Sequence, residues 1–210
     1  KKRTEGHKAG FSTLKTLAKH VLSKGTKTLS VFAFSTENFS RPQEEVDFLM
    51  NLFIEGFKKD SKYFQKENIK VVFSGRKEPL RKDVLKAMDD LVELTKDNTL
   101  GTLNICLNYG GRAEILHSVK NIAKRVENGE ISSDQITEEM ITEGLYTVGQ
   151  SDPDIIVRPS GEQRLSNFMI WQAAYSEFWY TDKLWPDFTT DDFDKVIEDY
   201  SRRQRRFGGV

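Results

Sequence analysis

Residues 154–167 read Asp-Ile-Ile-Val-Arg-Pro-Ser-Gly-Glu-Gln-Arg-Leu-Ser-Asn, a short apolar run that passes directly into a polar loop. The β-branched residues of this run predict a strand, and Arg158 closes it. The polar loop therefore begins at the carboxyl end of a strand, which is where open α/β sheets bind their ligands. This arrangement predicts an α/β fold with a binding loop at one edge of its sheet.

The rest of the chain alternates between helical and strand-like patterns. Apolar residues at helical spacing predict helices, and β-branched or aromatic runs predict strands. The predicted strands are residues 28–34, 69–73, 102–108, 154–157 and 177–180, and the predicted helices are residues 11–22, 42–64, 79–96, 112–128, 133–145, 168–175 and a last one from about 190. This alternation predicts a single α/β domain over residues 1–210, with a mostly parallel central sheet and helices on both faces.

The loop after the strand at 154–157 concentrates groups that bind anions. Arg158 and Arg164 supply two guanidiniums, and Ser166 supplies a hydroxyl. Each guanidinium can hold a phosphate through two charge-assisted hydrogen bonds, so the set can saturate the oxygens of a diphosphate. The alternative is an exposed loop whose arginines pair with Glu162 and Asp154. The density of cationic and polar groups favours the diphosphate site.

A second polar segment, residues 35–41, follows the first predicted strand. Ser35 and Asn38 offer uncharged hydrogen-bonding groups, and we expect Glu37 and Arg41 to pair and brace the loop. The Ser-Thr-Glu-Asn run is also typical of a helix cap or turn.

A third polar segment, Asn-Tyr-Gly-Gly-Arg at residues 108–112, follows another strand. Its two glycines let the backbone approach closely and open a helix whose free amides could face an anion, although a tight strand-to-helix turn explains them equally well. Because all three polar segments begin where parallel strands end, we expect them to converge on one cleft.

Charged residues elsewhere extend the expected site. Arg3, Gly6 and His7 precede the first predicted helix, where backbone amides and the helix dipole favour anions. His7 could donate to a phosphate oxygen, shuttle a proton or simply cap the helix. Glu177 stands in an aromatic, apolar stretch, and a buried carboxylate needs a partner. Mg²⁺ bound together with a diphosphate and a salt bridge to an arginine of the same site are the two alternatives.

Composition limits the class of partner. The chain has 210 residues with 32 basic and 32 acidic side chains, so no net charge attracts it to nucleic acid or to an anionic membrane. Four arginines lie within residues 202–206, for which we expect a solvated helix end, with nucleic-acid binding a minor alternative. The single cysteine, Cys106, lies in an apolar run and predicts a buried structural thiol in a reducing cytosol. No apolar stretch approaches the roughly 20 residues that cross a bilayer.

One predicted helix has a face rich in phenylalanine. This face either fills the core or lines an apolar channel, and periodicity does not separate the two. Its members are Phe48, Leu49, Leu52, Phe53, Phe57 and Phe64.

Several motifs occur together and in order along the chain. They are Phe-Ser-Thr-Glu-Asn from residue 34, Asn-Tyr-Gly-Gly-Arg from 108, the arginine loop with its preceding strand, Trp-Gln-x-x-Tyr-Ser-Glu from 171, Leu-Trp-Pro-Asp-Phe from 184 and Arg-Arg-Phe-Gly-Gly from 205. Together they resemble the cis-prenyltransferase family, in particular its bacterial undecaprenyl diphosphate synthases, from Arg3 to Val210. The resemblance implies an α/β transferase with an apolar tunnel beside the active site.

The resemblance also implies roles for the residues of the arginine loop. Arg158, Arg164 and Ser166 would hold the diphosphate of isopentenyl diphosphate, with Glu162 as structural support.

The metal site implied by the resemblance has two carboxylate ligands. Glu177 would be one ligand of Mg²⁺. Members of this family normally have an upstream strand and an Asp-Gly-Asn-Gly-Arg-Trp loop whose aspartate is the other ligand. That aspartate would stand upstream of Lys1, and the sequence in hand does not include it.

Residues nearer the start of the chain would serve the second substrate. Arg3 and His7 would contact the diphosphate of farnesyl diphosphate. The residues that would lie near the reacting ends of the substrates are Ser35, Asn38 and Arg41, with Glu37 bracing them. Among these, the resemblance gives catalytic roles to Asn38, Ser35 and His7.

The implied reaction adds isopentenyl diphosphate units in cis to farnesyl diphosphate and yields a long-chain polyprenyl diphosphate, the carrier lipid for bacterial cell-wall sugars. The implied enzyme is a Mg²⁺-dependent homodimer in which Arg206 and Gly208 reach the partner subunit's site. We expect it to be cytoplasmic, to contact the inner face of the membrane when product is released, and to bind no nucleic acid. A non-catalytic partner subunit is the competing hypothesis, although such subunits usually lose the arginine loop.

Overall fold

Five parallel strands form two small sheets in the computed structural model, which describes residues 3–204, with side chains from Glu5 onward. Strands β1 (Thr28–Ser35), β3 (Gly101–Tyr109) and β2 (Ile69–Ser74) lie in that order in the first sheet, all parallel. Strands β4 (Ile155–Arg158) and β5 (Glu177–Tyr180) pair in parallel in the second. The expected class, α/β with parallel strands, is confirmed.

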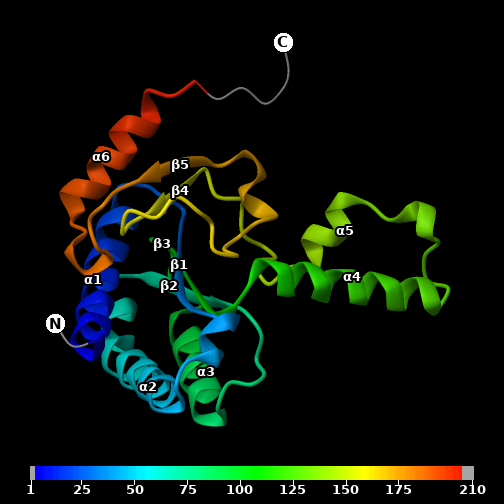
Figure 1. The fold of residues 1–210 in the computed structure, drawn as a ribbon, viewed down its shortest axis with the longest axis horizontal. Coiled ribbons are helices and arrows are strands. Elements are labelled where there is room, and N and C mark those ends of the chain that lie inside the picture. Colours follow the sequence, from blue (N-terminus) through cyan, green and yellow to red (C-terminus); the bar gives the residue numbers. More distant parts are fainter. Residues whose placement is uncertain (1–2, 205–210) are drawn as a thin grey trace.

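The helices surround these sheets, as Figure 1 shows, with α2 and α3 beneath the three-stranded sheet and β4, β5 and α6 above it. The α-helices are α1 (Arg3–Ser23), α2 (Gln43–Lys66), α3 (Lys82–Thr95), α4 (Gly111–Glu127), α5 (Glu138–Glu143) and α6 (Thr190–Ser201), and the 3₁₀ helices are η1 (Thr36–Ser40), η2 (Ser133–Gln135), η3 (Gln172–Tyr175) and η4 (Trp185–Asp187). Among the described residues, no helix combines the length and the apolarity that a bilayer span requires.

One difference from expectation concerns the sheet, which is divided rather than single and central. Strands β1 and β4 do not pair through their backbones, since each belongs to a separate sheet. Side chains from both sheets instead share a hydrophobic cluster, in which Leu29 of β1 and Val157 of β4 pack with Leu17 and Val21 of α1. Side-chain packing therefore joins the two sheets where backbone hydrogen bonds do not.

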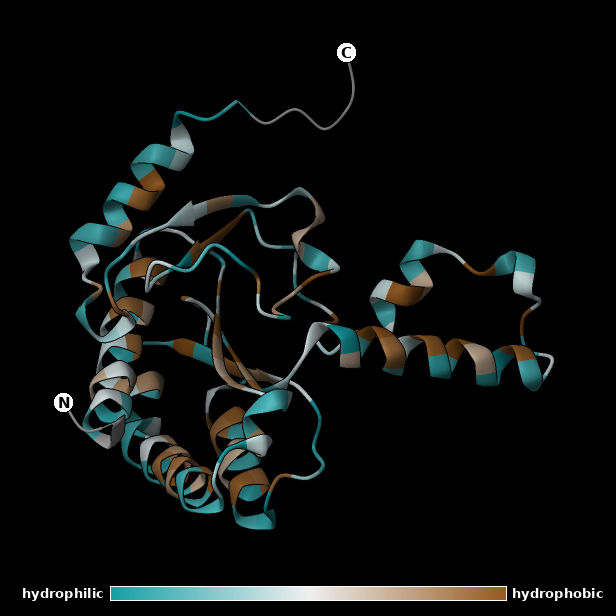
Figure 2. Cartoon of the chain, viewed as in Figure 1, coloured by the Kyte–Doolittle hydropathy of each residue, from teal (hydrophilic) through white to brown (hydrophobic). Residues whose placement is uncertain are grey.

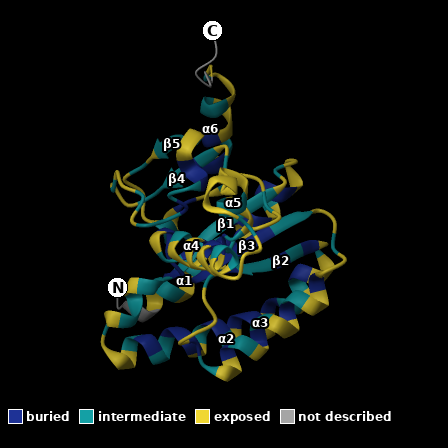
Figure 3. Ribbon diagram, turned by 90° about the vertical axis from the view of Figure 1, so that its right-hand side faces the viewer, coloured by how far each residue is buried: buried dark blue, intermediate teal, exposed yellow. Residues whose placement is uncertain are grey.

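The main core lies between the three-stranded sheet and the α2–α3 pair. Leu103, Ile105 and Leu107 of β3 are at most 2 % exposed and belong to the same cluster as residues of α2. Figure 2 shows apolar residues along these strands and on the covering helices, and Figure 3 shows the buried residues on the same elements. Phe53 and Phe57 of α2 are buried there, so the phenylalanine-rich face contributes to the core.

The segment at 133–145 was expected to be one helix, and this prediction is wrong. The chain forms η2, an extended residue at Ile136, and then the short helix α5. Two separate caps cause the break. The side chain of Gln135 accepts a hydrogen bond from the Ser132 amide, and the Thr137 hydroxyl accepts one from the Met140 amide. Helices α4 and α5 together form an arm that projects from the rest of the molecule (Figure 1).

The helix expected at 168–175 is also reduced, to the 3₁₀ turn η3. Met169 has a left-handed backbone, with φ of 46°, which ends any helix there. The side chain of Gln172 is drawn into tertiary hydrogen bonds, to Glu114 at 2.9 Å and to the Thr147 hydroxyl at 2.8 Å. These contacts fix the turn that leads into β5.

Candidate active site

The three polar segments that follow β1, β3 and β4 meet, and Asn167 connects them. Its side-chain nitrogen Nδ2 donates to Glu37 Oε1 at 2.7 Å. Its backbone oxygen accepts from the Gly111 amide at 2.7 Å, and its side-chain oxygen Oδ1 accepts from the Arg112 amide at 2.8 Å. The convergence expected from the strand ends is therefore present, although Asn167 itself was given no role from the sequence.

The contact between these segments is close enough to exclude even a methyl group. A Cβ placed on Gly110 would lie 2.6 Å from the Thr36 hydroxyl and 2.9 Å from Asn167 Nδ2. The first amides of α4 are used by Asn167, so the two glycines serve a tight strand-to-helix turn. Of the two alternatives for this segment, the structure favours the turn over an anion site.

The arginine loop brings Arg158 and Ser166 together. Arg158 Nη2 donates to Ser166 Oγ at 3.4 Å, whereas Arg158 Nε is buried and has no hydrogen-bond partner among the described residues. Arg164 forms an ion pair with Glu162. This pair is the one expected if the segment were an ordinary exposed loop. A buried guanidinium N–H without an acceptor is costly, so Arg158 is suited to an added anion.

The segment after β1 forms the 3₁₀ helix η1. The Ser35 amide donates to Asn38 Oδ1 at 3.0 Å, so this pair acts as a cap. Partial burial acts to raise the pKa of Glu37, but hydrogen bonds from its own amide, Asn167 and Thr36 outweigh it and lower the pKa overall. Glu37 is therefore a stable anion at neutral pH, bound to the arginine loop.

The expected Glu37–Arg41 pair is wrong. Arg41 Nη1 donates instead to Glu45 Oε1 at 3.0 Å, one turn further along in α2. Four residues separate Arg41 from Glu45, which is the spacing at which helical side chains meet, whereas Glu37 is held by Asn167. Sequence reasoning passed over Glu45, although this spacing was a usable signal.

His7 lies in the second turn of α1 rather than ahead of it, which corrects the expected helix start. Its Nε2 lies 3.9 Å from Glu45 Oε1, and its ring lies 6.5 Å from that of Phe48. Glu45 thus gathers His7 and Arg41, two residues expected near the second substrate.

Some of the expected site residues fall at the two ends of the chain. Arg3 begins α1, but its side chain is not described. Arg206 and Gly208 lie outside the described residues. So does Lys1, and the aspartate expected as the metal ligand beside Glu177 would stand upstream of it. The roles given to these positions therefore stay predictions.

Glu177 pairs with an arginine. Its Oε2 accepts from Arg203 Nη1 at 2.9 Å, and the same guanidinium reaches Phe178 O at 2.9 Å and Asp199 at 2.6 Å. Of the two alternatives for Glu177, the structure thus shows an arginine salt bridge. Within residues 5–204, no three His, Cys, Asp or Glu side chains come together as a metal site. These residues alone therefore do not make a complete site for Mg²⁺.

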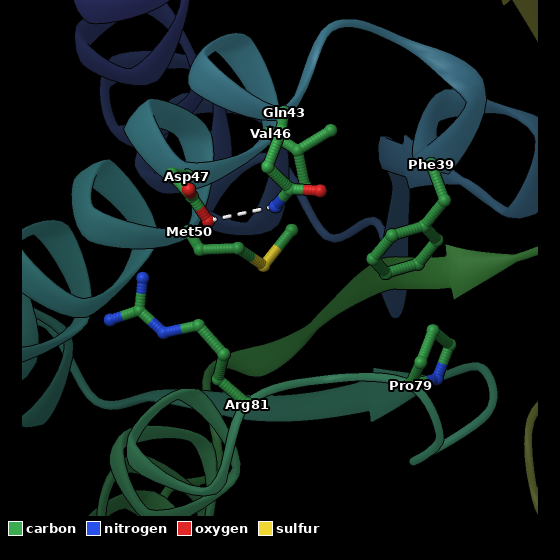
Figure 4. A pocket seen from close by; sticks show the side chains of 7 residues that line it. All are labelled: Phe39, Gln43, Val46, Asp47, Met50, Pro79 and Arg81. Atoms are coloured by element: carbon green, nitrogen blue, oxygen red, sulfur yellow. Dashed lines mark hydrogen bonds between the residues drawn. The ribbon is translucent and has the colours of Figure 1, made fainter.

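A pocket of about 290 Å³ adjoins η1 on the side of α2. Figure 4 shows its lining side chains, which come from η1, the first turns of α2 and the segment before α3: Phe39, Gln43, Val46, Asp47, Met50, Pro79 and Arg81. Neither Arg158 nor Arg164 lines it. The apolar tunnel beside the arginine loop remains a prediction.

Buried polar groups hold together the elements that carry the site. Glu114 of α4 is fully buried and accepts hydrogen bonds from the Tyr109 hydroxyl and from Gln172, and burial raises its pKa. It therefore ties β3, α4 and η3 together. Cys106 is also buried, which raises the pKa of its thiol, and the expectation of a structural cysteine is confirmed.

Comparisons with known proteins agree over nearly the whole chain. The isoprenyl transferase of Clostridium perfringens is 48% identical over 208 residues, covering 99% of this chain and 82% of that protein. The isoprenyl transferase of Thermotoga maritima is 47% identical, covering 99% of this chain and 88% of that protein.

Solved structures show the same fold. Lavandulyl diphosphate synthase from Lavandula x intermedia, in complex with dimethylallyl diphosphate, superposes with a TM-score of 0.93 at 33% identity, covering 98% of this chain and 89% of that one. A "probable undecaprenyl diphosphate synthase" from Campylobacter jejuni gives a TM-score of 0.84 at 31% identity, covering 96% and 93%.

The parallel α/β fold and the loops at its strand ends define an enzyme of the cis-prenyltransferase class. Within that class, residues 1–208 match the model of the family described as "Putative undecaprenyl diphosphate synthase". The chain belongs to this family and is an isoprenyl transferase of the undecaprenyl diphosphate synthase type.

Proposed function

We propose that this enzyme adds isopentenyl diphosphate repeatedly, in cis, to farnesyl diphosphate and so makes the long-chain carrier lipid of bacterial cell-wall synthesis. The observation that carries the proposal is the Arg158 guanidinium, whose buried Nε has no described partner while its Nη2 reaches the Ser166 hydroxyl. A diphosphate oxygen supplies the missing acceptor. Arg164 in the same loop would release its ion pair with Glu162 and bind the second phosphate of the diphosphate instead.

The chemistry requires two anion sites. One holds the allylic diphosphate more tightly as it leaves and gains charge, and the other holds isopentenyl diphosphate, whose diphosphate stays attached. Preorganised donors lower the barrier because they stabilise the charge that develops in the transition state. We assign Arg158, Arg164 and Ser166 to isopentenyl diphosphate, with Glu162 in support. The group near the reacting ends is Ser35, Asn38, Arg41 and His7, with Glu37 in support and Arg3 toward the allylic diphosphate.

Mg²⁺ is the cofactor we propose for the ionising diphosphate, to which it would supply positive charge. Glu177 is the described residue assigned to it, although its carboxylate accepts a hydrogen bond from Arg203. The other ligand we assign to the family's aspartate, upstream of Lys1. Chelation with EDTA should abolish turnover, and added Mg²⁺ should restore it.

The assembly we propose is a homodimer in which Arg206 and Gly208 complete the partner subunit's site. We also place the enzyme in the cytoplasm, in contact with the inner face of the membrane through its apolar product. Sedimentation with phospholipid vesicles, with and without added product, tests this contact.

The substitution that tests the function is Arg158→Ala, assayed with labelled isopentenyl diphosphate, farnesyl diphosphate and Mg²⁺. Arg158 is assigned to a diphosphate that does not ionise in the condensation, so loss of its charge-assisted bonds should act mainly through KM and lower kcat/KM for isopentenyl diphosphate roughly 10- to 150-fold. Arg125→Ala on the α4 arm, whose guanidinium lies 3.8 Å from Glu130, is the matched control and should leave kinetics unchanged. Normal kinetics for Arg158→Ala would overturn the site assignment.

The competing hypothesis, a non-catalytic partner subunit, predicts no turnover by the unmodified protein alone. The complete arginine loop argues against it, since a scaffold has no need of a guanidinium whose buried Nε has no described acceptor. Turnover by a full-length homodimer that carries the family's aspartate loop would exclude it.

A further inference from the structure

We propose that Asn167 is a positioning residue of the condensation reaction, setting the loop that binds one diphosphate in register with the loop that borders the reacting ends. The inference rests on the proposed function and concerns a residue that touches neither substrate in that proposal. It follows from the three hydrogen bonds of Asn167, each to a different residue.

The backbone of Asn167 explains how one residue reaches so many partners. It is left-handed, with φ of 65°, and follows Ser166 with φ of 50°. Asparagine tolerates this conformation better than other residues with a Cβ. The turn directs both its backbone oxygen and Oδ1 to the first amides of α4, at 2.7 and 2.8 Å, which leaves Nδ2 for Glu37.

Asn167 and Glu37 are each adjacent in the chain to a residue that we propose to bind substrate. Ser166 directly precedes Asn167, and Asn38 directly follows Glu37. The 2.7 Å bond between Asn167 and Glu37 therefore joins the arginine loop to η1 across 130 residues of sequence. Condensation needs two bound substrates at near-attack distance, and a displacement of about 1 Å can lower the rate roughly 100-fold.

The contact contributes little to global stability. Asn167 is only half-buried, and the hydrogen bond to Glu37 is at an exposed position. Such a bond contributes roughly 0.5–1.5 kcal/mol to folding. A large loss of kcat with little change in melting temperature would therefore indicate positioning rather than a structural role.

The test exchanges donor and acceptor in the hydrogen bond between residues 167 and 37. Asn167→Asp keeps the acceptor for the Arg112 amide but sets a second carboxylate against Glu37, so kcat should fall roughly 100-fold while KM for isopentenyl diphosphate stays within about threefold. Adding Glu37→Gln supplies an amide donor to the new carboxylate and should recover at least about tenfold of the lost kcat. Glu37→Gln alone keeps an acceptor for Asn167 Nδ2 and should lose less kcat than Asn167→Asp.

The matched control is Asn128→Asp, which alters an equivalent bond on the arm, from Asn128 Nδ2 to Glu130 Oε1 at 3.1 Å. It should leave kcat unchanged and lower the melting temperature only slightly, because the new carboxylate lies at the C-terminal end of α4. If Asn167→Asp does not fold, Glu37→Met removes the same bond from the other side and should show the same loss of kcat.

Two results would overturn the inference while the proposed function stands. One is an active unmodified enzyme whose Asn167→Asp or Glu37→Met variant is equally active. The other is a double variant no faster than Asn167→Asp. An unmodified enzyme that does not turn over the two substrates would instead overturn the proposed function, and this inference with it.

Discussion

A single side chain can fix the start of a helix in this protein, and Asp192 is a clear case. Its carboxylate accepts from Lys183 Nζ at 2.7 Å and from the Thr189 amide at 2.9 Å, at the start of α6. The lysine bond, followed by the cap, lowers the pKa of Asp192 from 3.8 to about 2. Asp192 is 6 % exposed, so it is an anchor for the helix rather than a surface charge.

We expect Asp192→Asn to destabilise the fold. The folded-state pKa lies below the unfolded value, so the carboxylate stabilises the protein above about pH 4, and this contribution is lost as the pH falls toward 2. The loss should be on the order of 1–2 kcal/mol near neutral pH, since the half-exposed lysine is screened by water. Urea unfolding between pH 2 and 7 measures it.

The matched control is Asp191→Asn, in the same first turn but exposed. It should change stability by no more than about 0.5 kcal/mol. A difference between the Asp192 variant and the unmodified protein that persists undiminished at pH 2 would contradict the assignment.

For individual residues, the sequence predicted which side chains belong to the candidate site, but it did not predict the hydrogen-bond or ion-pair partner of each one. Arg158 and Ser166 are near neighbours along a loop and were expected in one site, and the structure places them in contact. Glu37 was paired with Arg41, but it binds Asn167 instead. Neighbours along a chain can be read from spacing, whereas a partner 130 residues away depends on how loops pack.

Among the elements, the turn after β2 depends on a glycine. Gly75 has φ of 145°, and a Cβ there would lie 1.9 Å from the Leu107 carbonyl oxygen of β3. The next amide, of Arg76, donates to Asn108 O at 3.1 Å. This close approach holds the two strand ends together.

Gly75→Ala should therefore destabilise the protein more than the backbone conformation alone explains. Gly149→Ala is the control, because Gly149 also has a left-handed backbone, with φ of 82°, but has nothing within 4 Å of the added Cβ. The control should lose roughly 1–2 kcal/mol, and Gly75→Ala roughly 1–3 kcal/mol more. Equal losses in chemical denaturation would show that the clash is relieved without cost.

The elements themselves were largely predictable. Strand β5 was predicted at its observed bounds, and α2 was predicted from Pro42, one residue before its start. The failures at 133–145 and 168–175 have a common cause. Side chains that accept hydrogen bonds, Gln135 and Thr137, and one that donates them, Gln172, overrode a helical pattern of apolar residues.

For the whole molecule, the proposed homodimer is the property to measure. The α4–α5 arm projects from the body (Figure 1), and Leu116 and Val119 of α4 are 54 % and 46 % exposed. Apolar side chains exposed together suit a contact with a second copy. Sedimentation velocity should therefore give twice the chain mass of 24.2 kDa. A fully active species of single-chain mass at the assay concentration would contradict the dimer.

The α/β class, most of the elements in their order, the arginine loop at a strand end and the family were all predictable from the amino-acid sequence. These features follow from local periodicity, turn residues and motif spacing, which need no knowledge of distant contacts. The division of the strands into two sheets, the pairing of Glu177 with Arg203 and the joining of three segments by Asn167 were not predictable in this way. Those outcomes depend on distances between residues far apart in the chain, which are fixed only when the core has packed.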